Sequence, residues 1–123
     1  MDNLRITPLG EGQVLLEPGE ALDPSRPEEH LAGLYSRLRE LSARRLICDI
    51  GALPVIDPVY YGWLSRLASL CRVAGLEMVV VNMRPAAAYA LALQLDDTPS
   101  FTCERSVERA RRRPLSLPGA PEA

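Results

Sequence analysis

The chain has 123 residues, of which 47% are apolar, 24% are charged and only 5% are aromatic. These values are typical of one globular domain whose core consists mainly of aliphatic side chains. The formal net charge of −2 is too small to attract nucleic acid or an anionic membrane over a long distance. No signal peptide begins the chain, and no apolar run reaches the ~18 residues that span a bilayer. We therefore expect a cytoplasmic protein that binds neither nucleic acid nor membrane.

Three cysteines and one histidine are the candidate metal or redox residues. Cys48, Cys71 and Cys103 are far apart, and their odd number argues against a disulfide framework. Each has apolar neighbours, so we expect small buried side chains, with a metal or redox role as the alternative. His30 has only adjacent glutamates as candidate co-ligands, which favours a solvated surface residue. We expect no metal and no cofactor.

The first third of the chain predicts a hairpin followed by a helix. Residues 6–9 and 13–17 are short strand candidates around a glycine-rich turn. Ser25 and Glu28 match a capping box, and an apolar stripe at helical spacing follows: Leu31, Leu34, Tyr35, Leu38 and Leu41. Arg44 and Arg45 fall near the expected end of this helix, where basic residues suit its dipole.

The middle of the chain predicts a buried strand and a long amphipathic helix. Residues 46–50 form a short apolar run. Asp57 is a candidate N-cap, and Pro58 suits the first helical position of a helix over 58–74. At 100° per residue, one half of this helix is apolar and the other half is mostly polar. Gly75 is a candidate C-cap.

The last third predicts two more strands and two more helices. Residues 76–81 are the clearest strand, and residues 101–103 form a short, edge-type strand. Between them Pro85 opens a helix that reaches residue 95, with Ala88, Leu91, Ala92 and Leu95 on one stripe. Ser106 is a candidate cap for a final helix. The Pro-rich residues 114–123 predict a disordered tail.

The order of these elements predicts an α/β fold. Strands and helices alternate through the middle of the chain, which favours a small mixed sheet of about four to five strands flanked by about four helices. We expect one domain over residues 1–113.

Three segments, in the correct order and spacing, carry a resemblance to a known family. They are Gly19–Asp23, residues 46–50 with Val55–Asp57, and Ala74–Val81 with Arg84-Pro85. Together they resemble the STAS domain, and the region looks most like stand-alone anti-sigma-factor antagonists and RsbS-type stressosome scaffold subunits. The resemblance implies a protein-protein interaction switch that docks a GHKL-type serine kinase (an anti-sigma factor) or another STAS protein, in a homo- or hetero-oligomer.

The resemblance also implies a site at the start of the helix over 58–74. In that family a Ser or Thr usually follows the loop aspartate and is phosphorylated by the partner kinase. Here Pro58 occupies that position and has no hydroxyl group to accept phosphate. We expect the partner-binding residues to be Asp57, Pro58, Val59, Tyr61, Ser65 and Arg66, although Asp57 can equally be a structural cap and Tyr61 a core residue.

Other charged residues give no sign of catalysis. The sequence has no Gly-rich phosphate loop, no nucleophile motif and no clustered metal ligands, so we expect no enzyme. Asp49 is either a lone strand carboxylate or part of a polar rim near Asp57. Four arginines, at 109 and 111–113, form a solvated helix end or a contact with an acidic partner or nucleic acid. A structural subunit of a signalling assembly, or a small-molecule or nucleotide-binding STAS domain, is the alternative function.

Overall fold

In a computed structural model, described for residues 4–19, 22–94 and 101–115, strands and helices alternate around one five-stranded sheet. The elements are β1 (Leu4–Gly10), β2 (Gln13–Pro18), α1 (Glu28–Glu40), β3 (Arg45–Asp49), α2 (Pro58–Ala74), β4 (Glu77–Val81), α3 (Pro85–Gln94), β5 (Thr102–Glu104) and α4 (Val107–Arg112). The strand order is β1-β2-β3-β4-β5; β1 and β2 are antiparallel and the other pairs are parallel. The predicted element order and mixed sheet are confirmed.

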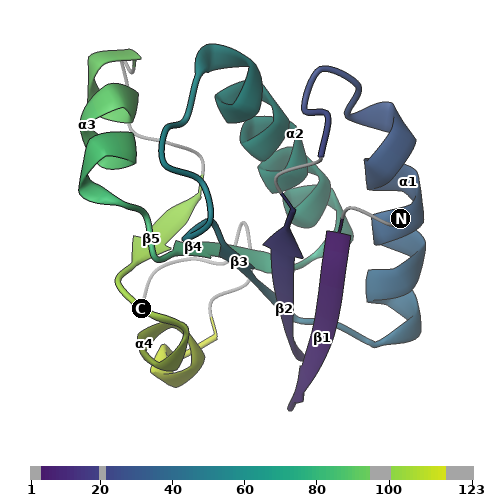
Figure 1. Ribbon diagram of the computed structural model, residues 1–123. Helices are drawn as coiled ribbons and strands as arrows, with labels where there is room; N and C mark the ends of the chain where they lie inside the picture. The colour runs from purple at the N-terminus through teal and green to yellow at the C-terminus, as the bar shows by residue number, and fades with distance from the viewer. Residues whose placement is uncertain (1–3, 20–21, 95–100, 116–123) are drawn as a thin grey trace.

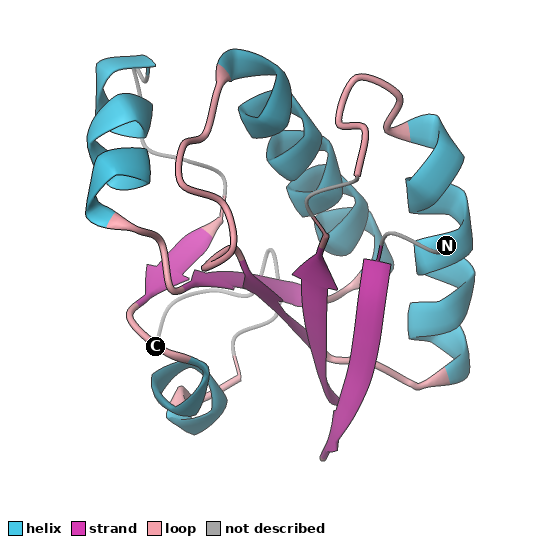
Figure 2. Ribbon diagram, in the orientation of Figure 1, coloured by secondary structure: helices cyan, strands magenta, loops and turns pink. Residues whose placement is uncertain are grey.

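The helices cover the sheet unequally. Figures 1 and 2 show α1, α2 and α3 on one face of the sheet, while the short helix α4 lies on the opposite face. None of the helices within the described ranges is long and apolar enough to cross a lipid bilayer. Residues 116–123 of the predicted tail lie outside the described residues, so the domain limit at residue 113 stays a prediction.

Local sequence signals define several boundaries as predicted. The hairpin turn between β1 and β2 uses three successive residues with positive φ, Gly10, Glu11 and Gly12. α2 begins at Pro58 and ends at Ala74, and Gly75 takes the left-handed conformation (φ 79°) of a C-cap. At the start of α4 the Ser106 hydroxyl accepts the Arg109 N–H at 3.2 Å, which confirms the predicted cap.

Both predicted ends of α1 are wrong. Its N-cap is Pro27, which makes no side-chain cap bond, because the Ser25 hydroxyl instead donates to Asp23 Oδ1 at 2.6 Å in a turn of its own. The helix ends at Glu40, and Ser42 takes a positive φ of 51° directly after it. Arg45 therefore starts β3 rather than standing near a helix end.

The predicted apolar stripe of α3 is confirmed at Leu91, which is buried, and wrong at Ala88 and Ala92, which are exposed. Ala87 is buried instead, and Leu95 lies outside the described residues. Because nearly every position of this helix is Ala, Leu or Tyr, the sequence pattern does not determine which face turns toward the sheet.

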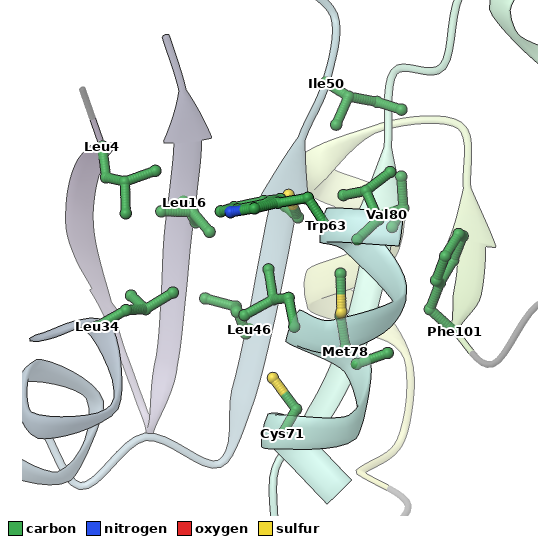
Figure 3. Packing of buried hydrophobic residues seen from close by; sticks show 14 of the residues in the cluster. Leu4, Leu16, Leu34, Leu46, Ile50, Trp63, Cys71, Met78, Val80 and Phe101 are labelled. Atoms are coloured by element: carbon green, nitrogen blue, oxygen red, sulfur yellow. The ribbon is translucent and has the colours of Figure 1, made fainter. Parts of the chain in front are cut away.

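The main core lies between the sheet and the helices α1 and α2. In Figure 3 the indole of Trp63 extends toward Leu16 of β2, and the ring is 1% exposed. Cys48 and Cys71 are part of this core, and burial raises the pKa of the Cys71 thiol to about 12. The prediction of buried thiols is confirmed for these two residues. It is wrong for Cys103, which is exposed because β5 is an edge strand.

A smaller core lies between the sheet and α4. Ile47, Val79, Val81 and Ala110 are fully buried there. The side chains of β3 and β4 are therefore covered on both faces of the sheet, which explains why both strands are nearly continuous apolar runs in the sequence.

A buried guanidinium group joins this second core to the end of α4. Arg45 is 0% exposed and donates to Glu77 Oε2 at 3.3 Å, to the Ala110 carbonyl at 2.8 Å and to the Pro114 carbonyl at 2.9 Å. Arg113 extends the cluster, since its Nε lies 3.8 Å from Glu77 Oε1. The charge of Arg45 is thus paired, and two of its donors satisfy carbonyl groups at the C-terminal end of α4.

We predict that Arg45→Met destabilises the protein by about 3–5 kcal/mol, because it removes the buried guanidinium beside Glu77 and the donor to the carbonyls of Ala110 and Pro114. Urea unfolding followed by circular dichroism measures the change. Arg44→Met is the matched control, since Arg44 is exposed and its change is expected to stay within about 0.5 kcal/mol. Equal stabilities of the two variants would contradict the role given to Arg45.

Candidate partner-binding surface

The first turn of α2 is held by the residue predicted to cap it. Asp57 has an extended backbone, and its Oδ1 accepts the Tyr60 N–H at 2.7 Å. Pro58 occupies the first helical position, where the missing N–H costs no helical hydrogen bond. Both residues are exposed. The start of α2 is therefore capped by a side chain and faces the solvent.

Apolar side chains surround this cap. We call residues 54–59 the α2 tip. Val55 is 55% exposed and Val59 is 50% exposed, while Ile56 between them is fully buried and anchors the segment to the main core. The α2 tip thus combines exposed apolar groups with a buried anchor. The sequence reasoning missed Val55, because an irregular loop has no periodicity from which to infer which valine or isoleucine points outward.

Polar contacts fix the loop that leads to the α2 tip. Asp49 Oδ1 accepts the Gly51 N–H at 2.9 Å, and Asp49 Oδ2 accepts Asn82 Nδ2–H at 3.1 Å. Arg84 Nε donates to the Gly51 carbonyl at 2.8 Å. These residues follow the carboxyl ends of β3 and β4, where open α/β sheets commonly bind their partners. Asp49 thus has hydrogen-bond partners, and it connects the loop after β3 with the loop after β4.

The residues predicted to bind a partner do not all share one side of α2. Val59 and Arg66 line a groove of about 300 Å³ that faces α1, where Arg66 lies 3.5 Å from Glu28. Tyr61 lies on the other side of the helix and is half-buried. Its ring packs edge-on against the ring of Phe101, with 6.3 Å between the two ring centroids. The half-buried Ser65 is one turn further along the helix from Tyr61. Only Asp57, Pro58 and Val59 belong to the α2 tip.

Tyr60 is the buried residue that follows the α2 tip. Burial raises the pKa of its hydroxyl above the ordinary value. Within residues 4–19, 22–94 and 101–115, no three His, Cys, Asp or Glu side chains lie close enough to hold a metal ion. What the geometry offers is a firm, mainly apolar projection from the protein.

Solved structures with the same arrangement exist, although no protein-family model and no curated protein matches the sequence. A serine-to-glutamate variant of Moorella thermoacetica RsbS superposes with a TM-score of 0.75 at 20% identity, over 86% of this chain and 91% of that one. The chain has a STAS-like fold. A structure described as the molecular architecture of the stressosome superposes with a TM-score of 0.73 at 19% identity. The match covers 89% of this chain and 100% of that one. The NMR structure of the protein TM1081 superposes with a TM-score of 0.72 at 14% identity, over 92% of this chain and 90% of that one. The sequence-based resemblance to the STAS fold is confirmed.

We predict that Asp57→Ala lowers the free energy of unfolding by about 1 kcal/mol, because the N–H of Tyr60 loses its side-chain acceptor. Asp57→Asn, which keeps an acceptor oxygen, is expected to retain most of the stability. Chemical denaturation of the three proteins measures the difference. If Asp57→Asn lowered the free energy of unfolding as much as Asp57→Ala does, the charge of Asp57 rather than its capping hydrogen bond would stabilise the helix.

Proposed function

We propose that this STAS-like protein is a non-catalytic docking module whose α2 tip binds a second STAS protein or a GHKL-type serine kinase. The observation that carries the proposal is the exposure of Val55, Pro58 and Val59 on a segment fixed by the Asp57 cap. A preorganised apolar surface loses little conformational entropy on association, so it suits specific docking. Such a role fits the cytoplasm, the location expected from the sequence.

The likeness to stressosome structures supports a signalling scaffold of the STAS type. One similar structure is an RsbS protein and another is described as part of a signal integration and transduction hub. A structural subunit of such an assembly is therefore the second candidate. Size-exclusion chromatography with light scattering separates the two: self-association favours the structural subunit, whereas a strict monomer favours a stand-alone antagonist.

Pro58 determines how the proposed docking is controlled. A phosphoryl group at a helix N-terminus is stabilised by the helix dipole and free N–H groups, but proline supplies no hydroxyl group and no N–H. Control of the complex then lies in the partner, and this chain is a permanently unphosphorylated binder at the α2 tip.

We predict that Val59→Glu weakens binding to the cognate partner about tenfold or more, because it places a charge in a desolvated apolar contact. Candidate partners are the STAS proteins and GHKL-type kinases encoded beside this chain, and isothermal titration measures the affinity. Val73→Glu is the matched control: Val73 is 87% exposed near the other end of α2. If both variants bind as the unchanged protein does, the α2 tip is not the interface.

We predict that Pro58→Ser creates a phosphate acceptor for a cognate GHKL-type kinase, whereas the unchanged protein and Pro58→Ala accept none. Incubation with kinase and ATP, followed by intact mass spectrometry, detects the added phosphate. Phosphate on Ser65 or Ser69 of the unchanged protein would contradict the view that only the partner is regulated.

A further inference from the structure

A second surface lies at the opposite edge of the sheet from the hairpin. Met83, Ala88, Cys103, Glu104, Arg105 and Arg109 line an open groove of about 760 Å³, which we call the β5 groove. Figure 1 shows β5 between α3 and α4 at this edge. The groove shares no lining residue with the α2 tip, so its chemistry requires a separate explanation.

Among its described lining residues, the β5 groove has more positive than negative charges. Glu104 is neutralised by Arg113, whose Nη1 lies 2.9 Å from its carboxylate, and this hydrogen bond lowers the pKa of the Glu104 carboxyl. Arg105 and Arg109 are exposed and make no ion pair with any described residue. Two arginines thus remain available for carboxylates of a partner.

The backbone at the groove also favours an extended partner. β5 is the last strand of the sheet, so its outer edge faces no strand of the described sheet. The other edge strand, β1, carries Pro8 and an irregular register between Pro8 and Gly10, features that oppose strand addition. β5 contains no proline, and its three residues limit the pairing to a short segment.

We propose that the β5 groove binds a short, extended, acidic segment of a partner protein, which pairs with the outer edge of β5 and places its carboxylates on Arg105 and Arg109. Met83 and Ala88 offer apolar contacts for alternate side chains of the segment. A nucleic acid fits less well, because the described lining residues include the carboxylate of Glu104 and no aromatic ring on which a base would stack.

Cys103 provides the readout, since it lines the β5 groove and is exposed while Cys48 and Cys71 are buried. The test follows its alkylation by N-ethylmaleimide with intact mass spectrometry. Although Cys103 is exposed, partial desolvation by its neighbours raises the pKa of its thiol, so a mildly alkaline buffer is used. At about 1 mM, an alternating Glu-Val hexapeptide is expected to slow the reaction about fivefold, which corresponds to a dissociation constant near 0.25 mM.

Matched variants separate the groove from overall charge. Arg105→Glu with Arg109→Glu is expected to abolish the slowing. Arg5→Glu with Arg72→Glu makes the same change in net charge at exposed positions outside the groove and is expected to preserve the slowing. Continued resistance of the two buried cysteines to alkylation shows that each variant is folded.

Four outcomes would overturn the proposal. They are no slowing by the Glu-Val peptide, equal slowing by a Lys-Val peptide, stronger slowing by a single-stranded oligonucleotide, and slowing that survives Arg105→Glu with Arg109→Glu. Slow alkylation without any peptide, together with a dimer in light scattering, would mean that a second copy of the chain occupies the groove instead.

Discussion

The buried guanidinium of Arg45 is the constraint on which the two-sided architecture depends. It neutralises Glu77, its direct register partner on the neighbouring strand, and satisfies the carbonyls of Ala110 and Pro114 at the end of α4. Because α4 has only six residues, it could not persist as an isolated helix in water. The Arg45 contacts, together with the small apolar core, hold it on the sheet, and so both faces of β3 and β4 are shielded from solvent.

A buried ion pair is a weak source of net stability, because desolvation of the charges offsets much of their attraction. An apolar side chain in place of Arg45 would fill the same volume but would not specify which carbonyl groups lie over it. In this protein the guanidinium contacts the C-terminal end of α4, and Arg45 pairs with Glu77, its register partner on β4. That register also aligns the carboxyl ends of β3 and β4, from which the α2 tip and its supporting loop emerge.

The features that could be predicted from the sequence are those encoded within a few residues. Asp57 with Pro58, Gly75 and Ser106 each act on their own helix end, so a local pattern is sufficient. The burial of Arg45 depends on Glu77, 32 residues away, and on backbone carbonyls more than 60 residues away. No local pattern reports such partners. The buried face of α3 and the exposure of Cys103 could not be predicted from the sequence either, because both follow from packing at one edge of the sheet.

The two surfaces of the protein differ in chemistry because they arise from different constraints of one topology. The α2 tip projects from the carboxyl ends of central strands, and the burial of Ile56 anchors the apolar groups exposed around it. The β5 groove lies at a sheet edge, where the strand has one neighbour, and α4 supplies Arg109 to it. Since Arg45 contacts the end of α4, the position of Arg109 depends in part on the buried ion pair that joins β3 and β4. Loosening the pair would therefore disturb the basic groove before the α2 tip, whose cap and anchor lie on the other face.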